Sequence, residues 1–202
     1  MLTIYELKPR FQNLLRPITD WLAHHKITAN QITLFALLLS ILTGTLLASY
    51  TEQTQLFLSL PIVLFVRMAL NAIDGMLERE HHMKSALGAI LNELADVISD
   101  VALYLRFALL PFVSLWLVVL IVIGAVISEM MGVIAIQIGA SRRYDGPMGK
   151  SDRAFIFGFL GLILGLGFQP GIGFNILLVL ILLLTIWTII NRARQALLEI
   201  QP

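Results

Sequence analysis

The chain has 202 residues, of which 58% are apolar and only 13% are charged. Soluble domains hold about 45–50% apolar and about 25% charged residues, so this composition excludes a soluble globular fold and predicts several membrane spans. The net charge is +1, and the lack of cysteine excludes disulfides and thiolate chemistry.

The first predicted element is a helix within residues 1–28. Apolar residues recur there at helical spacing with cations between them, which is typical of an amphipathic helix in the membrane interface. The apolar positions are Ile4, Leu7, Phe11, Leu14, Leu15, Ile18 and Leu22, and the cations are Lys8, Arg10 and Arg16. We therefore divide the chain into this interfacial segment and a membrane domain over residues 29–202.

Six stretches of the remaining chain are candidate spans, because a spanning helix needs roughly 20 mainly apolar residues. They are 32–49, 55–77, 87–110, 112–138, 154–168 and 173–191. The fifth is short, and the second and third carry charged residues. The sequence thus predicts an all-α integral membrane protein with six transmembrane helices in one compact bundle.

The basic residues predict the orientation of these spans. Twelve of the 14 Lys and Arg lie in segments that fall on one side of the predicted membrane, and the opposite loops hold none. The twelve are Lys8, Arg10, Arg16, Lys26, Arg79, Lys84, Arg142, Arg143, Lys150, Arg153, Arg192 and Arg194. Since basic loops stay in the cytoplasm, we expect both termini there.

Polar residues inside spans two and three form the candidate site, because ionisable groups in a span are costly. Residues three and four apart share a helix face, so Asn71, Asp74 and Glu78 lie together. Gly88, Asn92, Asp96 and Asp100 lie together in the same way. The two spans are antiparallel, so these faces meet just inside the cytoplasmic boundary.

Carboxylate and amide oxygens without His or Cys indicate a hard cation such as Mg²⁺, Mn²⁺ or Ca²⁺. Mg²⁺ is usually bound between a few carboxylates and substrate phosphates, which indicates a phosphate-bearing ligand. A second interpretation is that these residues only join the helices by hydrogen bonds. The paired, glycine-containing array favours a site.

The two faces together resemble the signature of the CDP-alcohol phosphotransferases (CDP-alcohol phosphatidyltransferases). The family pattern is D-x-x-D-G-x-x-A-R, then eight or more residues, then G-x-x-x-D-x-x-x-D. The matching residues are Asp74, Gly75, Arg79, Gly88 and Asp96. The family also has six spans, an N-terminal interfacial helix, an Asn-x-x-Thr element and a basic Gly-Lys element. The last two are matched by Asn30 with Thr33 and by Gly149, Lys150 and Arg153.

This resemblance implies a transfer reaction at the cytoplasmic face of the plasma (inner) membrane. A CDP-linked alcohol, often CDP-diacylglycerol, binds with its diphosphate on divalent cations, Mg²⁺ or Mn²⁺. A second alcohol, with or without a phosphate of its own, attacks the phosphorus nearer the lipid, and CMP leaves. Family members commonly form homodimers, and no nucleic-acid partner is expected.

Position in the motif implies a role for each residue. Asp96 is the implied general base and a metal ligand, and Asp74, Asn71 and Asn92 stand at the other metal-ligand positions. The residues implied for the nucleotide and its diphosphate are Gly75, Arg79, Gly88, Asn30 and Thr33. The residues implied for the acceptor are Lys150, Arg153 and Arg142, although topology alone explains Arg142 equally well.

Three motif positions depart from the family pattern. Asn71 and Asn92 stand where the family has Asp, and Glu78 replaces Ala. An Asn oxygen still binds a hard cation but adds no charge, so a second metal should bind weakly or only with substrate. The alternatives to an enzyme are a paralogue that binds cation and nucleotide-lipid as a sensor or scaffold, and a transporter.

Two further charges, Arg67 and Asp100, lie inside the spans beyond the motif. In two consecutive antiparallel spans, the two residue numbers at any one depth add up to a nearly constant value, which we call the index sum. This sum pairs Asn71 with Asp96 and Asp74 with Asn92. The same sum pairs Arg67 with Asp100, about one helical turn deeper. We predict a buried, non-catalytic ion pair there, since each charge relieves the cost of the other. The alternative is that Asp100 binds metal and Arg67 binds phosphate.

Overall fold

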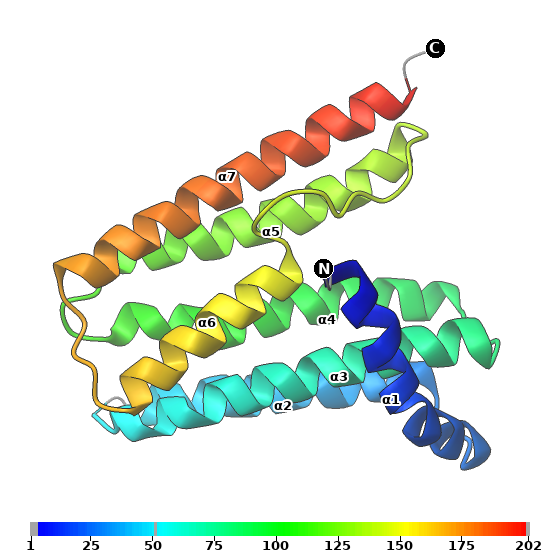
Figure 1. Ribbon diagram of the computed structural model, residues 1–202, viewed down its shortest axis with the longest axis horizontal. Coiled ribbons are helices and arrows are strands. Elements are labelled where there is room, and N and C mark those ends of the chain that lie inside the picture. Colours follow the sequence, from blue (N-terminus) through cyan, green and yellow to red (C-terminus); the bar gives the residue numbers. More distant parts are fainter. Residues whose placement is uncertain (1–3, 51, 201–202) are drawn as a thin grey trace.

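The computed structural model describes residues 4–50 and 52–200, with side chains from residue 9 onward. The predictions for Ile4, Leu7 and Lys8 therefore lie outside the described side chains. The described chain is helical, with short connections except for the long loop between α5 and α6, which confirms the all-α fold (Figure 1). Its helices are α1 Ile4–His24, α2 Ala29–Ser49, η1 Thr54–Leu58, α3 Ser59–Glu80, α4 Ala86–Tyr104, η2 Leu105–Leu109, α5 Leu115–Gln137, α6 Lys150–Gly165 and α7 Ile172–Ile200; η1 and η2 are 3-10 helices.

Four helical segments in the described part of the chain are long and apolar enough to cross a membrane. They are α2, η1 with α3, α5 and α7. Helix α4 carries three carboxylates, and α6 has only 16 residues, or about 24 Å of length. Both run alongside the other four (Figure 1). The count of six spans therefore stays a prediction.

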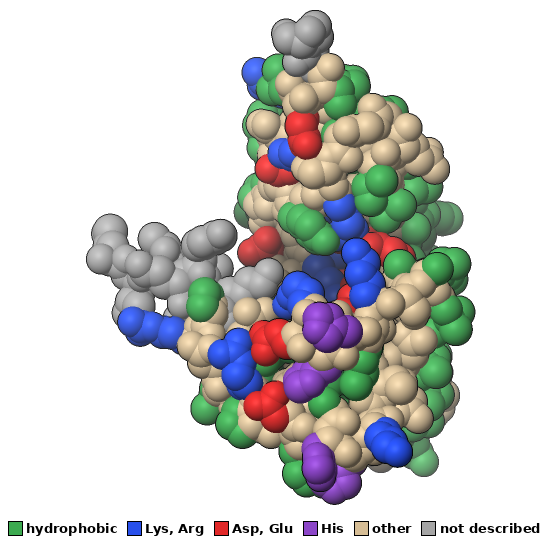
Figure 2. Space-filling model, turned by 90° about the vertical axis from the view of Figure 1, so that its right-hand side faces the viewer, with side chains coloured by type: hydrophobic (Ala, Val, Ile, Leu, Met, Phe, Trp, Pro, Cys, Tyr) green, Lys and Arg blue, Asp and Glu red, His purple; other side chains and the backbone are tan. Residues whose placement is uncertain are grey.

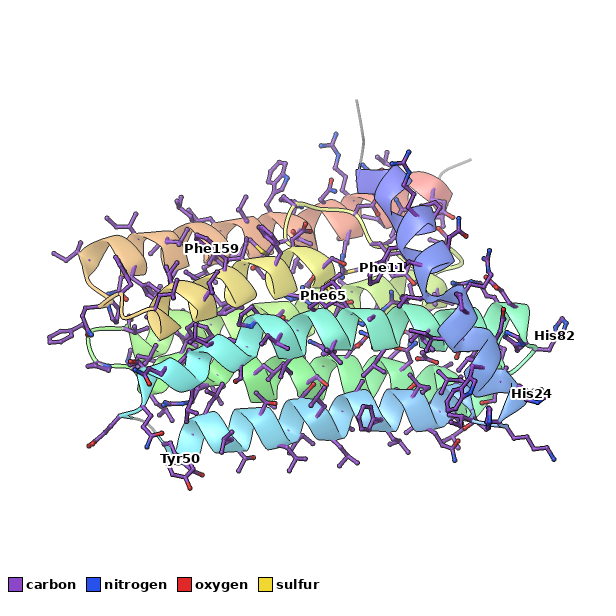
Figure 3. The ribbon with its side chains drawn as sticks, turned by 60° about the horizontal axis from the view of Figure 1, so that its bottom comes forward. Phe11, His24, Tyr50, Phe65, His82 and Phe159 are labelled. Carbon is purple, nitrogen blue, oxygen red and sulfur yellow. The ribbon has the colours of Figure 1, made fainter. Side chains whose placement is uncertain are left out.

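The bundle has two ends that differ in their connections. The α1–α2 and α3–α4 connections lie at one end, where His24 and His82 are labelled in Figure 3, and Tyr50 lies at the opposite end. We call these the His82 end and the Tyr50 end. The C-terminal end of α7 also lies toward the His82 end (Figure 1). The predicted basic segments therefore gather at one end of the molecule.

Helix α1 crosses α3 near the His82 end (Figure 1). Leu15 packs into a small core with Ile73, Met76 and Leu77, and the rings of Phe11 and Phe65 lie edge to face at 6.0 Å (Figure 3). The other side of α1 exposes apolar side chains, Leu14, Ile18 and Trp21 among them. This arrangement supports an interfacial helix, whose location at the membrane surface stays a prediction.

The outer surface of the bundle is apolar. Phe35, Leu42, Phe65 and Trp187 all have more than half of their side chains exposed. The inner core joins α3 to α7 around Tyr104 and Phe157, whose rings stack at 4.2 Å. Lipid tails cover such a surface without cost, because they are as apolar as the side chains themselves. The distribution fits a bundle embedded in a bilayer.

Close approach of α2 and α4 depends on Gly44. A Cβ atom there would lie 2.2 Å from the carbonyl oxygen of Ala102. We expect Gly44→Ala to destabilise the protein by about 1–3 kcal/mol, because the backbones must separate. Thermal unfolding in detergent measures this loss. Gly173→Ala is the control, because a Cβ there meets nothing within 4 Å. Equal losses for both variants would contradict the tight α2–α4 contact.

Candidate active site

The polar faces of α3 and α4 meet toward the His82 end. Both helices pack against α2, and they approach each other mainly through side chains. Asn71 Nδ2 donates a hydrogen bond to Asp96 Oδ1 at 3.3 Å, which is the contact that the index sum predicts. Asn71 from the first half of the motif and Asp96 from the second half therefore face each other between α3 and α4, and α2 packs against both helices.

Asp74 is held by α2 rather than by α4. Its carboxylate is buried, and its Oδ2 accepts a hydrogen bond of 2.8 Å from the hydroxyl of Thr33. No hydrogen bond joins the described side chains of Asp74 and Asn92, so this part of the index-sum pairing is not seen as a contact. Thr33 is itself buried, and it orients the carboxylate. Its predicted contact with the nucleotide would therefore act through Asp74.

Gly88 and Gly75 leave room for neighbouring polar side chains. A Cβ on Gly88 would lie 2.8 Å from Oδ1 of Asn30 and 3.3 Å from Oε1 of Glu78. A Cβ on Gly75 would lie 3.1 Å from the guanidinium of Arg79. Asn30, Glu78 and Gly88 therefore cluster at the rim of the site. The crowding by these side chains is itself a reason for glycine at position 88.

Asp96 faces cations from two other helices. Its Oδ2 accepts a hydrogen bond from Lys150, the first residue of α6, and Arg67 of α3 lies 3.5 Å from its Oδ1. The side chain keeps 16% of its surface exposed, whereas Asp100 keeps only 6%. Asp96 is thus the more accessible of the two carboxylates on this face of α4.

Beneath Asp96 lies a set of buried ion pairs, which we call the buried charge cluster. Arg67 Nη1 donates to Asp100 Oδ1 at 2.6 Å, so the predicted pair is in contact. Arg153 of α6 binds both Asp100, at 3.0 Å, and Glu129 of α5, at 2.9 Å. The other members around Glu129 are Arg192 of α7, which lies 3.4 Å from it, and Arg142, which lies 3.6 Å from it. Charges from five helices and one loop are therefore linked in one cluster.

Two of the residues predicted to bind the acceptor, Arg153 and Arg142, already form ion pairs within this cluster. Arg153 is fully buried, with its donors on Asp100, Glu129 and the carbonyl of Met148. Breaking a buried charge pair costs about 3–5 kcal/mol, so this burial argues against direct acceptor contact by Arg153. Arg142 holds Glu93 at 2.6 Å and stacks over the ring of Tyr144. Burial lowers the pKa of Arg142, but the hydrogen bond and negative charge of Glu93, together with Tyr144, raise it by more, so the pKa is raised.

Sequence reasoning missed Arg192, which it assigned to topology alone. Arg192 is buried and donates to the carbonyl oxygens of Ser128 and Asp145 as well as facing Glu129. The available signal was Glu129, an acid within an otherwise apolar span. Such an acid requires a cationic partner, and Arg192 was one of the candidates.

The oxygen donors of the site suit a hard divalent cation only in part. No group of three His, Cys, Asp or Glu side chains that could hold a metal is found among the described residues. The carboxylates are Asp74 and Asp96, and the amides are Asn71 and Asn92. Two carboxylates with amide oxygens match the way Mg²⁺ is bound when substrate phosphates complete its coordination. The set fits a cation that binds together with a phosphate-bearing ligand.

Figure 2 shows the surface of the His82 end. Lys, Arg, Asp, Glu and His side chains gather there, and the surface is hollowed near its middle with cationic side chains set back in the recess. Hydrophobic side chains lie along the right-hand edge of the same view. A polar recess at the end of a bundle whose outer surface is apolar suits a ligand with a charged head and an apolar tail.

Comparison with known sequences identifies relatives over most of the chain. The sequence model of the family described as CDP-alcohol phosphatidyltransferase matches residues 26–189. The inner membrane protein YnbA of Escherichia coli is 52% identical over 197 residues, with 98% of each chain covered. The archaetidylinositol phosphate synthase of Pyrococcus horikoshii is 34% identical over 104 residues, which cover 52% of this chain and 53% of that protein.

Comparison with solved structures identifies the same architecture. The chain is similar to crystal structures of Mycobacterium tuberculosis phosphatidylinositol phosphate synthase (PgsA1), at 17% sequence identity. For the PgsA1 structure with CDP-DAG bound, the TM-score is 0.73, and the match covers 89% of this chain and 92% of that chain. For the PgsA1 structure in complex with manganese and citrate, the TM-score is 0.74, and the match covers 92% of this chain and 91% of that chain. At this identity the likeness shows a shared fold.

Proposed function

The chain belongs to the CDP-alcohol phosphatidyltransferase family and is an integral membrane protein, and we propose that it transfers a phosphatidyl group from CDP-diacylglycerol or a related CDP-alcohol to a hydroxyl acceptor. One observation supports this most: Asp74 and Asp96, the two motif carboxylates, lie on helices whose polar faces meet, with Asn71 bonded to Asp96. The complex of PgsA1 with CDP-DAG supports a nucleotide-lipid donor.

We propose that Asp96 takes the proton of the acceptor hydroxyl. The acceptor oxygen then forms a bond to the phosphorus nearer the lipid, the bond from that phosphorus to the CMP oxygen breaks, and CMP leaves. Asp96 suits this role because it is partly exposed and neighbours both halves of the motif. Thr33 holds Asp74 in one orientation and so prepares it for the donor.

A divalent cation, Mg²⁺ or Mn²⁺, would be held by Asp74 and Asp96 with help from Asn71 and Asn92. When bound, it would neutralise charge that develops on the diphosphate oxygens. We propose that Arg79, Gly75, Gly88 and Asn30 contact the nucleotide and its diphosphate. They surround the rim of the site, where Arg79 lies against Gly75 and Asn30 lies against Gly88.

For the acceptor we propose Lys150 as the principal contact. Its side chain keeps 27% of its surface exposed, and its partner Asp96 is the proposed base. Arg142 lies at the edge of the same region, and Arg153 would act from below by holding Asp100. An acceptor phosphate would replace Asp96 as the partner of Lys150. We propose that this site faces the cytoplasm, as the distribution of basic residues predicts.

The test of this function is metal-dependent release of CMP. Purified protein with CDP-diacylglycerol and a panel of alcohols, phosphorylated and not, should release CMP only with Mg²⁺ or Mn²⁺. A chelator should abolish the release, and added metal should restore it. Binding of CDP-diacylglycerol without CMP release, for every acceptor and metal, would instead support the sensor or scaffold. Solute flux across vesicles without CMP would support a transporter.

The two Asn residues predict weak metal binding in the absence of substrate. Asn71→Asp with Asn92→Asp should tighten Mn²⁺ binding by about tenfold or more, because each change adds a charged oxygen ligand. Isothermal titration calorimetry on the full chain measures the affinity. Glu80→Gln, an exposed change at the end of α3, is the control and should leave it unchanged. Unchanged affinity in the double variant would remove both residues from the metal site.

A further inference from the structure

A cavity lies at the Tyr50 end, away from the motif residues. It is a groove of about 490 Å³ between α2, α4 with η2, and the first turns of α5. Its walls include Ile41, Leu105, Leu109 and Leu115, which are all more than a third exposed, so the groove opens to the outside of the bundle. This volume falls within the range of about 300–1,000 Å³ that is typical of small-molecule sites.

Arg106 of η2 lines this groove and is only 3% exposed. Among the described residues, its Nε and Nη1 have no hydrogen-bond partner, and no Asp or Glu lies within salt-bridge distance of it. The guanidinium carbon lies over the ring of Phe57, 5.6 Å from its centroid. A buried guanidinium without an anion is costly, so a ligand that supplies one is favoured here.

The groove is separate from the candidate active site. Arg106 follows Asp96 by ten residues, which places it about 15 Å further along the helix axis. Residues of the buried charge cluster, Asp100 foremost, lie between the two. The groove therefore reaches the leaflet on the Tyr50 side, opposite the leaflet that the motif residues face.

We propose that this groove binds an anionic phospholipid of that leaflet, with its phosphate on Arg106 and an acyl chain along the apolar walls. The apolar lining favours a chain, and the unpartnered guanidinium favours a phosphate, since Arg binds phosphate oxygens by paired hydrogen bonds. An anionic phospholipid has both an acyl chain and a phosphate, and the lipids of this leaflet lie beside the opening of the groove. This ligand is distinct from the nucleotide-lipid donor, and its binding does not depend on the proposed function.

The experiment measures retained lipid by native mass spectrometry and thermal unfolding in nanodiscs. Full-length protein in phosphatidylcholine, with rising fractions of phosphatidylglycerol, should retain one phosphatidylglycerol and unfold at rising temperature. Arg106→Gln should weaken that retention by tenfold or more, and Arg106→Lys should keep part of it. Ala108→Phe, which fills the groove without changing charge, should also lose the lipid. Arg16→Gln, an exposed change on α1, is the control.

Several outcomes would overturn the proposal. One is retention by Arg106→Gln or Ala108→Phe at the wild-type level. Another is equal stabilisation of lipid-free protein by inorganic phosphate, which would indicate a free-anion site. A third is a rise in the KM for CDP-diacylglycerol in Ala108→Phe that matches the lost retention, which would indicate that the groove holds the donor's own chain. If Arg106→Gln fails to fold, Arg106→Lys and Ala108→Phe decide the matter.

Discussion

Replacing Asp96 by Asn is expected to lower the rate of CMP release by at least about 100-fold, because positioned general bases contribute about 10²–10⁴-fold. The amide keeps the shape of the side chain but accepts no proton. It also removes the charge that faces Lys150 and Arg67. The measurement is CMP formation by purified protein at saturating CDP-diacylglycerol, acceptor and Mn²⁺.

The matched control for this variant is Glu80→Gln, the same chemical change on an exposed acid of α3. Glu80 pairs only with Arg16 among the described contacts, and both side chains are more than a third exposed, so its loss should leave turnover unchanged. Size-exclusion chromatography in detergent shows whether each variant is folded. A folded Asp96→Asn variant with wild-type turnover would contradict the assignment of the base.

Removing the charge of Asp100 is expected to destabilise the protein strongly. Asp100→Asn leaves two buried cations, Arg67 and Arg153, without their shared carboxylate. Removing one partner of a buried pair costs about 3–5 kcal/mol. Arg67→Met should cost less, because Asp100 keeps Arg153. Thermal unfolding in a mild detergent gives both values relative to wild type.

A double-mutant cycle separates the pair from its surroundings. Arg67→Met together with Asp100→Asn should cost less than the sum of the two single losses, because neither charge is then left without the other. The exposed pair Arg16 and Glu80 serves as the control and should contribute about 1 kcal/mol or less. Strictly additive losses at Arg67 and Asp100 would show that their contact carries no coupling energy.

The sequence predicted the helices better than their internal breaks. Hydropathy predicted a single span over 87–110. In the structure the α-helix changes to a 3-10 helix at Leu105, and that 3-10 helix ends at Leu109, before Pro111. Apolar composition is the same for both helix types, so hydropathy cannot separate them. Proline explains only the end, because it disfavours helical backbone in the residue before it.

The index sum predicted depth in the membrane but not rotation about the helix axis. It therefore found Asn71 with Asp96 and Arg67 with Asp100, which face each other across α3 and α4. It could not find the hydrogen bond from Thr33 to Asp74, because α2 does not enter a sum over two helices. Arg153 with Glu129 was equally out of reach, since a long loop separates their helices and fixes no register.

The buried charge cluster restricts how this chain can change over generations. Each charged side chain in it touches at least one opposite charge, and Glu129 faces three cations. Replacing one of these residues alone therefore leaves an uncompensated buried charge, and we expect selection to remove such a sequence. Acceptable change at positions 67, 100, 129, 153 and 192 requires coordinated replacement. Sequences that diverge freely on the lipid-facing surface should covary at these five positions.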